Sequence, residues 1–241
     1  MTAIEITDLT KKFKERTAVD SLNLSIEKGE FFALLGQNGA GKTTTIKMLC
    51  CLSAPTSGDA VLLGDSIVKN PEAVKQKLNV SPQETAVAPN LSVKENLELI
   101  AGIYGSNKHE ARLKAETIIQ TFGLNDRTKD KAKTLSGGLQ RRLSIAMAMI
   151  SDPEIIFLDE PTLGLDVRAR RELWKSLNLL KGKKTIILTT HYLEEAEALS
   201  DRIGIMHQGK LKALGTAEQL KQQTGAASFE DAFLKLTEAE A

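Results

Sequence analysis

The chain has 241 residues, of which 41% are hydrophobic and 26% charged, and its formal net charge is +1 at pH 7. This length fits one large α/β domain or a core with a smaller lobe. The near-zero charge excludes an overall attraction to nucleic acid, so no nucleic acid partner is expected. No apolar stretch approaches the roughly 18 residues that cross a bilayer, and the N-terminus lacks a signal-peptide layout. Any work at a membrane therefore requires docking to another chain.

The first 35 residues predict strands. Apolar residues at period two in residues 4–9 and 22–26 indicate half-buried strands, and the run FFALL at residues 31–35 indicates a short buried one. Phe13 lies between the first two strands. An aromatic side chain here is either a packing residue or, beside a nucleotide site, a surface on which adenine can stack.

Residues 36–44, GQNGAGKTT, follow the buried strand and lead into a predicted helix. They fit the phosphate-loop pattern G-x-x-x-x-G-K-[ST] in its strand-to-helix context. Glycines let backbone N–H groups turn toward a triphosphate and allow unusual φ values, and the positive end of the helix faces the phosphates. We expect a nucleotide-binding set of Gly36, Gln37, Asn38, Gly39, Ala40, Gly41, Lys42, Thr43 and Thr44.

Two members of that set have distinct expected roles. Lys42 can reach the β- and γ-phosphates, and the Thr43 hydroxyl can bind Mg²⁺. The alternative, a glycine-rich turn that binds nothing, is disfavoured by the full motif. The only cysteines, Cys50 and Cys51, are adjacent on the helix that follows, which excludes a metal site or a useful disulfide and indicates a reducing cytosol.

The middle of the chain becomes helical. A turn cluster at residues 54–59 precedes a strand at 60–63, a short helix is predicted at 71–77, and a strand runs into the loop that carries Gln83. Ser92 with Glu95 forms a capping box, a second helix covers residues 108–122, and a third starts near Ser136. We interpret residues 89–150 as a helical subdomain inserted into an α/β core.

The last part returns to alternating strands and helices. The apolar run at residues 154–158 is typical of a parallel strand buried on both faces. A helix at 167–180, a strand at 185–190 and two strands flanking the Gln208-Gly209 turn follow. This order predicts a mostly parallel sheet with right-handed crossovers, which binds ligands at the carboxyl ends of its strands.

Two carboxylates stand at the end of the buried strand. Successive strand residues point in opposite directions, so Asp159 and Glu160 can take different roles. Asp159 suits Mg²⁺, held through water, and Glu160 suits polarisation of the attacking water. The alternative is an acidic turn before a proline, which the phosphate loop in the same chain disfavours.

Residues 135–142, LSGGLQRR, form a second glycine-containing helix start. Ser136 as N-cap, followed by Gly137 and Gly138, leaves N–H groups exposed at a positive helix end, which is a second anion site. A capped helix with a basic first turn remains the alternative on local grounds. The basic pair Arg141-Arg142 by itself indicates a solvated helix end.

Together, GQNGAGKTT, LSGGLQRR, IIFLDEPTLGLD and His191 resemble the nucleotide-binding subunit of an ATP-binding cassette (ABC) transporter, in the family's order over nearly the whole chain. The resemblance implies a P-loop NTPase fold with an N-terminal antiparallel β subdomain and an inserted helical subdomain. It implies one ABC ATPase domain over residues 1–225, with its core at 1–88 and 151–225, the helical subdomain at 89–150 and a short tail at 226–241.

The resemblance also implies roles. Two cassettes pair head to tail, so ATP held by Lys42 of one is covered by Ser136 and Gly138 of the other, with Gly137 between them. Asp166 matches the loop that communicates across this dimer.

Three further positions match the family around the nucleotide. Phe13 matches the aromatic that stacks on adenine, Gln83 the glutamine that contacts Mg²⁺ and senses the γ-phosphate, and His191 the switch histidine at the γ-phosphate. Without the family, a lone histidine after a strand is usually structural.

The chain departs from the family at one place. The signature usually reads LSGGQ, whereas Leu139 stands at the fifth position, so the glutamine contact is absent or supplied by Gln140. Such substitutions, and the tail at residues 228–237, resemble the ABC-2 export type, although the tail also fits a generic packing helix.

The resemblance implies an ATP- and Mg²⁺-dependent ATPase that powers export of a drug, lipid, polysaccharide or ion through a separate transmembrane permease subunit. We expect a homodimer at the cytoplasmic, inner face of the cell membrane. The alternatives are an importer subunit, a soluble single-cassette ABC ATPase of the iron–sulfur assembly type, and a different P-loop enzyme such as a kinase. A kinase leaves LSGGL and His191 unexplained.

Overall fold

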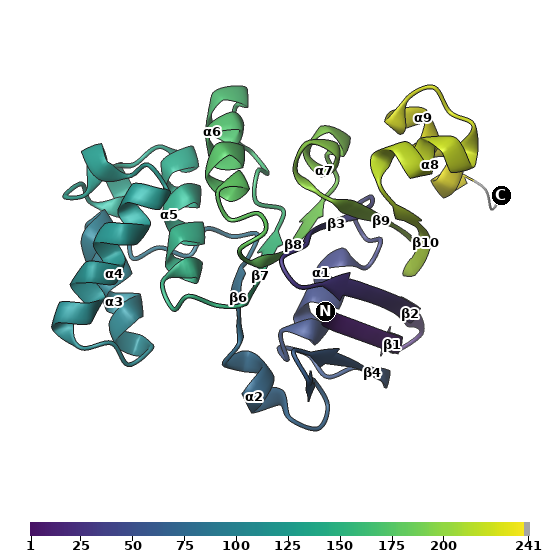
Figure 1. Cartoon of the computed structure of the whole chain (residues 1–241), viewed down its shortest axis with the longest axis horizontal. Helices are drawn as coiled ribbons and strands as arrows, with labels where there is room; N and C mark the ends of the chain where they lie inside the picture. The colour runs from purple at the N-terminus through teal and green to yellow at the C-terminus, as the bar shows by residue number, and fades with distance from the viewer. Residues whose placement is uncertain (239–241) are drawn as a thin grey trace.

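Two β-sheets organise the computed structural model, which describes residues 1–238 (Figure 1). The last three residues of the predicted tail, 239–241, lie outside the described residues. The larger sheet has the order β10-β9-β3-β8-β7-β6, and its neighbours are parallel except for β9 and β10. The predicted mostly parallel sheet is therefore confirmed. Its strands are β3 (Phe31–Leu35), β6 (Leu78–Ser81), β7 (Ile155–Asp159), β8 (Thr185–Thr190), β9 (Arg202–His207) and β10 (Lys210–Gly215).

The smaller sheet is antiparallel, with the order β2-β1-β4-β5. Its strands are β1 (Thr2–Phe13), β2 (Arg16–Glu27), β4 (Ser57–Leu62) and β5 (Asp65–Ser66). β4 begins within the segment predicted as a turn. Gly58 has a φ of 76°, and a Cβ there would lie 2.2 Å from the Asp8 carbonyl oxygen. Turn-type residues thus form a bulged strand end, because only glycine fits against β1.

The described helices gather mainly at the two ends of the molecule. Figure 1 places α3, α4 and α5 at one end and α8 and α9 at the other. The capping box of Ser92 and Glu95 at the start of α3 is confirmed. The helices are α1 (Lys42–Leu49), α2 (Pro71–Lys75), α3 (Val93–Ile103), α4 (Lys108–Thr121), α5 (Gly137–Met149), α6 (Val167–Asn178), α7 (Leu193–Leu199), α8 (Ala217–Thr224) and α9 (Phe229–Glu238).

Helix α1 ends before the two cysteines, which corrects their predicted place on a helix. The Leu52 N–H donates to the Lys47 carbonyl and the Cys51 N–H to the Met48 carbonyl. Cys51 has a φ of 55°, so this pair of bonds is a Schellman ending. No helix within residues 1–238 combines the length and apolar character needed to cross a membrane.

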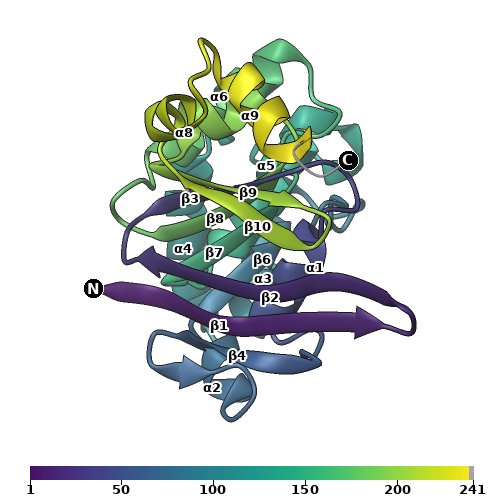
Figure 2. The same ribbon diagram turned by 90° about the vertical axis from the view of Figure 1, so that its right-hand side faces the viewer.

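Three apolar clusters hold the layers together. One lies between the two sheets, which are stacked in Figure 2, and includes Ile46 of α1 and Phe157 of β7. A second joins the opposite face of the large sheet, including Phe31, to helices α3 to α6. Because β3 and β7 face both clusters, they need the continuous apolar runs that the sequence shows, while β8 faces both with its apolar middle, residues 186–188. The third cluster packs α8 and α9 on β9 and α7, with Phe229 and Phe233 buried.

Candidate active site

A cavity of about 430 Å³ opens beyond the carboxyl ends of the parallel strands. Its walls come from loops after β3, β6, β7 and β8 and from the β1–β2 hairpin. The structure brings many of the predicted site residues together here. The lining residues are Phe13, Arg16, Ala18, Asn38, Gly39, Gly41, Lys42, Thr43, Thr44, Gln83, Glu160, Leu163 and His191.

The loop after β3 turns sharply at two glycines. Gly39 has a φ of 85° and Gly41, the N-cap of α1, a φ of 107°. A Cβ on Gly41 would lie 2.5 Å from the Ala18 carbonyl oxygen, and one on Gly36 would lie 2.4 Å from the Met206 carbonyl oxygen. Gly36 is therefore required by the approach of the chain's own backbone, in addition to the room that we expected it to leave for a ligand.

The tip of the β9–β10 hairpin anchors the same loop. The Gly209 N–H donates to the Ala40 carbonyl at 3.0 Å, and the Asp20 N–H donates to the Gly209 carbonyl at 2.9 Å. Gln208 and Gly209 have φ values of 46° and 81°, as a tight hairpin turn with two left-handed residues requires. One turn thus connects the loop after β3 with the antiparallel sheet.

Lys42 lies among anionic and carbonyl oxygens. Its Nζ donates to the carbonyls of Gly36 at 2.7 Å and Gln37 at 3.2 Å, and it lies 3.1 Å from Glu160 Oε1. The side chains of Lys42 and Glu160 are only 5% and 6% exposed. Burial of either charge is tolerable because the two are paired.

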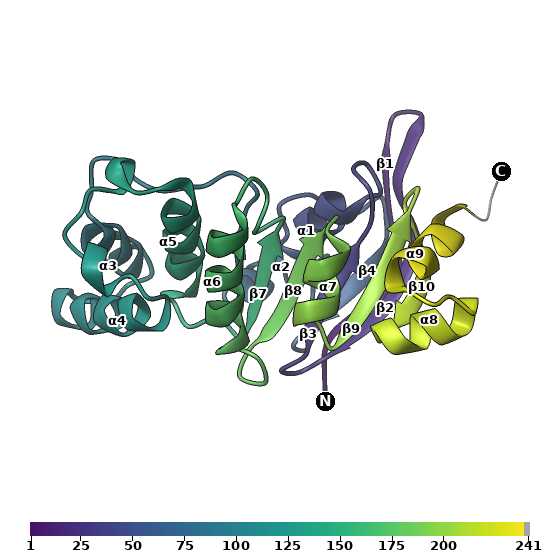
Figure 3. The same cartoon turned by 90° about the horizontal axis from the view of Figure 1, so that it is seen from above.

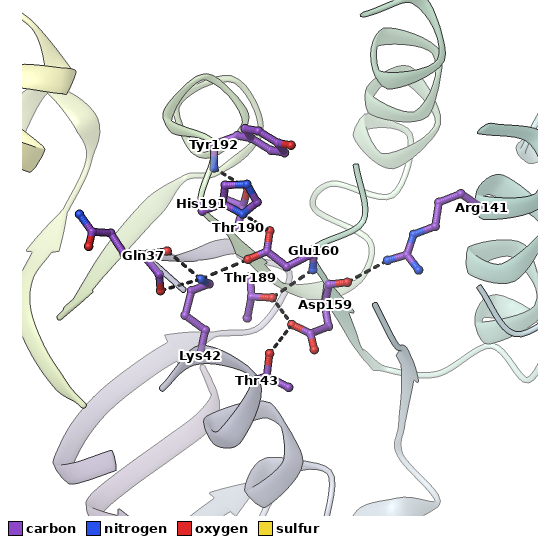
Figure 4. Close-up of polar contacts among 11 residues, drawn as sticks. Gln37, Lys42, Thr43, Arg141, Asp159, Glu160, Thr189, Thr190, His191 and Tyr192 are labelled. Carbon is purple, nitrogen blue, oxygen red and sulfur yellow. Dashed lines mark hydrogen bonds and ion pairs between the residues drawn. The ribbon is translucent and has the colours of Figure 1, made fainter. Parts of the chain in front are cut away.

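Glu160 bridges two side chains (Figure 4). Its Oε2 lies 2.8 Å from His191 Nδ1, while its Oε1 faces Lys42. Glu160 has a φ of 48°, and its N–H donates to both the carbonyl and the hydroxyl of Thr189 at 3.1 Å. A left-handed conformation is costly for glutamate, and these two bonds of its backbone N–H hold it in place. The fixed backbone in turn directs the carboxylate toward Lys42 and His191.

Asp159 faces a different set of partners. Its Oδ1 accepts hydrogen bonds from the hydroxyls of Thr43 at 3.1 Å and Thr189 at 2.5 Å. The neighbouring carboxylates of Asp159 and Glu160 therefore point to different groups. Alternation along a strand is not the cause, because β7 ends at Asp159 and Glu160 has a left-handed backbone conformation.

Sequence reasoning missed three residues at this site. Arg16 lines the cavity and donates to the Gly39 carbonyl at 3.3 Å. Glu195 is fully buried on α7, where burial raises the pKa of its carboxyl while the Thr190 and Thr162 hydroxyls and the Trp174 indole oppose that rise. Arg141 is only 3% exposed, so the expectation of a solvated basic helix end at Arg141-Arg142 was wrong. A charged residue inside a capped helix gives no local sign of distant partners.

The remaining predicted residues lie away from the cavity wall. Ser136 caps α5, where its hydroxyl accepts from the Leu139 N–H at 3.4 Å, and Asp166 caps α6 by accepting from the Ala169 N–H at 2.8 Å. The two helices lie side by side (Figure 3). A Cβ on Gly138 would meet the Ala169 Cβ at 2.7 Å.

Neither Leu139 nor Gln140 offers the side-chain amide that the usual signature glutamine would supply to an opposed nucleotide. Gln140 Nε2 donates to the Leu135 carbonyl at 3.1 Å, and Leu139 packs against the helical core. Of the predicted set, Gly36, Gln37, Ala40, Ser136, Gly137, Gly138, Asp159 and Asp166 do not line the cavity.

Comparisons with known proteins point to one family. The sequence profile described as ABC transporter matches residues 19–163. The chain is 39% identical over 225 residues to the daunorubicin resistance ATP-binding protein DrrA3 of Streptomyces coeruleorubidus, covering 93% of this chain and 71% of that protein. It is 39% identical to the probable multidrug ABC transporter ATP-binding protein YbhF of Escherichia coli strain K12, covering 98% of this chain but 42% of the length of YbhF.

A solved structure agrees in fold. The dimeric, post-hydrolysis structure of the ATP-binding cassette MJ0796 with ADP and Pi superposes with a TM-score of 0.78 at 27% identity, covering 88% of this chain and 98% of that one. The expected P-loop NTPase fold, with its antiparallel and helical additions, is confirmed. The family profile and the relatives also confirm the resemblance seen in the motifs, and the chain belongs to the ABC transporter family.

Proposed function

We propose that this chain is the ATP-binding and ATP-hydrolysing subunit of an exporter of the ABC-2 type. The observation that carries the proposal is the convergence of Lys42, Glu160 and His191, from three separate loops, on one cavity at the carboxyl ends of the sheet. Each of the three residues follows a different strand, so only the folded sheet brings their side chains together. A site of this composition suits charge stabilisation in phosphoryl transfer.

The lining of the cavity indicates how ATP would lie. The N–H groups of the loop at residues 36–44 and the positive end of α1 would face the phosphates. Phe13, which also lines the cavity and is 52% exposed, offers a face for adenine, and Lys11 Nζ lies 5.1 Å from the centre of its ring.

The residues near Thr43 fit a hard divalent cation. Thr43 Oγ1 lies 3.1 Å from an Asp159 carboxylate oxygen, and Gln83 lines the same cavity. Within residues 1–238, no cluster of three or more His, Cys, Asp or Glu side chains could hold a metal alone. One carboxylate with hydroxyl and amide oxygens suits Mg²⁺ that also binds phosphate oxygens. We assign Thr43, Gln83 and Asp159 to Mg²⁺, which would neutralise phosphate charge.

Hydrolysis follows from the partners of Glu160. The γ-phosphate offers Lys42 an anionic partner in place of Glu160. Released from that ion pair, Glu160 polarises the attacking water, while His191 Nδ1 keeps its carboxylate oriented and the other side of the ring approaches the γ-phosphate.

The second half of the site comes from a second copy of the chain. Ser136, Gly137, Gly138 and Asp166 lie outside the cavity, and Ser136 is exposed at a helix start with no acidic residue in its first turn. One chain carries both kinds of surface, so a head-to-tail homodimer completes two sites. The dimeric MJ0796 cassette supports this arrangement.

We also propose that the chain divides into a core at 1–88 and 151–225, a helical subdomain at 89–150 and a tail at 226–241.

The transported substrate passes through a separate transmembrane permease, which holds this chain at the inner face of the membrane. A groove of about 290 Å³ lined by Pro82, Ile103 and Tyr104, among others, suits that partner, since Ile103 is 70% exposed. DrrA3 and YbhF, named for drug resistance and multidrug transport, favour export over import or a soluble role. A pull-down from detergent-solubilised membranes should recover a polytopic protein with the wild type and lose it with Ile103→Asp. Recovery of soluble partners alone would contradict the transporter role.

The catalytic part of the proposal is tested with Glu160→Gln. This variant keeps the shape of the side chain but removes its charge. It should therefore bind MgATP, while turnover falls by about 100-fold or more. Steady-state phosphate release and nucleotide titration measure the two properties. Glu154→Gln, at an exposed carboxylate just before β7, is the control and should hydrolyse ATP normally. Near-normal turnover in Glu160→Gln would remove Glu160 from the reaction.

A further inference from the structure

Arg141 makes a set of contacts that the proposed reaction does not use. It lies in the second turn of α5, and within residues 1–238 its guanidinium donates to backbone carbonyls alone. Nε donates to Pro161 at 2.9 Å and Nη2 to Asp159 at 2.8 Å, the bond drawn in Figure 4. Nη1 donates to Gln83 at 3.1 Å and also to Pro82.

These carbonyls belong to two neighbouring segments beside the cavity. Pro82 and Gln83 follow β6, whereas Asp159 is the last residue of β7 and Pro161 comes directly after Glu160. β6 and β7 are parallel neighbours whose pairing ends at Ser81 and Leu158. Beyond that pair, no strand pairing joins the end of β6 to the end of β7. The Arg141 guanidinium connects the two segments there.

The chemistry of the fork explains why arginine is needed. Burial lowers the pKa of Arg141 to about 10, and the nearby carboxylates of Asp159 and Glu195 oppose that change. The guanidinium therefore stays charged at neutral pH, with five donors in a fixed plane. A lysine carries the same charge, but its three donors diverge from a single nitrogen, so it cannot reach all four carbonyls that the guanidinium bonds from three separate nitrogens. Buried charges of this kind are weak evidence for stability alone, because an apolar side chain is often as stabilising.

We propose that Arg141 is a positioning residue that fixes Gln83 relative to Asp159 and Glu160. This inference rests on the proposed function, in which Gln83 and Asp159 hold Mg²⁺ and Glu160 polarises water. By bonding the backbone of both loops, Arg141 sets the spacing between the two sides of the Mg²⁺ site without touching the nucleotide. The nucleotide itself is bound by the phosphate loop and Lys42, and neither makes a bond with Arg141.

The neighbouring arginine provides a matched control. Arg142 is also buried, at 7% exposure, but it pairs with Glu172 at 2.6 Å and with the Phe122 carbonyl, and it contacts neither loop. Replacement of either arginine removes one buried cation from the same helix turn. A purely structural role predicts similar consequences for both.

The test uses the full chain with Arg141→Lys, Arg141→Met and Arg142→Met. Four quantities are measured: the melting temperature, nucleotide affinity without Mg²⁺, kcat, and the Mg²⁺ concentration that half-saturates hydrolysis. Both Arg141 variants should lose about 10- to 100-fold in kcat, the size of effect that a 1 Å misplacement causes. Their half-saturating Mg²⁺ concentration should rise severalfold, with Mg²⁺-free affinity unchanged. Arg142→Met should keep wild-type kcat and Mg²⁺ dependence.

Three outcomes would overturn the inference. They are wild-type kcat in Arg141→Lys, an unchanged Mg²⁺ dependence in both Arg141 variants, or an equal loss in Arg142→Met. Arg141→Lys, which keeps the charge, covers the case in which Arg141→Met fails to fold. If the wild type itself hydrolyses no ATP, the proposed function fails; if it hydrolyses ATP and the Arg141 variants behave like it, only this inference fails.

Discussion

The two predicted anion sites differ in how their polar groups are satisfied. Around the cavity, Lys42 and Glu160 are buried and paired with each other. At the start of α5, Ser136 and Gly137 are exposed and the helix end faces outward. Sequence reasoning gave both the same basis, a glycine-bearing loop before a helix. The first region is therefore assembled within one chain, whereas the second leaves its donors exposed, as the proposed contact with a second copy requires.

Complementation gives the largest expected effect and tests this comparison directly. Lys42→Ala and Ser136→Arg should each reduce ATP hydrolysis by about 100-fold or more, because each homodimer then lacks one half of both sites. Mixed in equal amounts, heterodimers regain one intact site, so activity should recover to about a quarter of the wild-type value. Phosphate release by the mixture is the measurement. Activity no greater than the mean of the separate variants would show that the α5 region does not complete a site in a second copy.

Phe13 sharpens the comparison at the exposed edge of the first region. Phe13→Ala should weaken ATP binding by about 10-fold, since a base stacked on an aromatic ring contributes roughly 1–3 kcal/mol. Calorimetric titration measures the affinity. Phe13→Trp keeps a stacking face and should bind nearly as the wild type does. The ring is half exposed, so neither change should lower the melting temperature; equal affinity in both variants would remove Phe13 from the nucleotide site.

The smallest effect concerns the buried wall behind the cavity. Burial raises the pKa of Glu195 above its ordinary value of 4.5. The folded state therefore holds this proton more tightly than the unfolded state, so the stability it contributes is complete below about pH 4.5 and is lost as pH rises through the folded pKa. Glu195→Gln cannot ionise and still accepts from Trp174. Its melting temperature should decline less between pH 5 and 8, by roughly 2 to 4 °C. An identical decline in both proteins would contradict the shift.

Much of the fold was predictable from local pattern. The buried strand β3 has the bounds that its apolar run predicts, because every position of this parallel strand is covered on both faces. β8 also has its predicted bounds, although only its middle is apolar and its threonines are buried. The predicted start of β4 was wrong because close contact with β1 requires glycine at position 58, and glycine in sequence is typical of a turn. Helices α7 and α8 were missed, since both are short and rich in polar residues.

The site divides in the same way. A motif such as the loop at residues 36–44 carries its own geometry, so its place beside Glu160 and His191 could be expected. Arg141 could not be expected, because its partners lie 18 to 59 positions away along the chain. Periodicity and capping describe one helix, whereas such a residue is defined by loops that the helix meets only after folding.

The strand order also constrains how the protein can be made. β3, which carries the phosphate loop, pairs on one side with β8 and on the other with β9, and the tip of the next turn holds Ala40. On the ribosome, Leu35 therefore waits for Ile205, about 170 residues or roughly ten to thirty seconds of translation later. Until β8 has emerged, β3 has no partner on either edge, and one edge stays unpaired until β9 follows. We expect stalled nascent chains to acquire nucleotide binding only after Gly209 has left the exit tunnel, and to depend on chaperones before that.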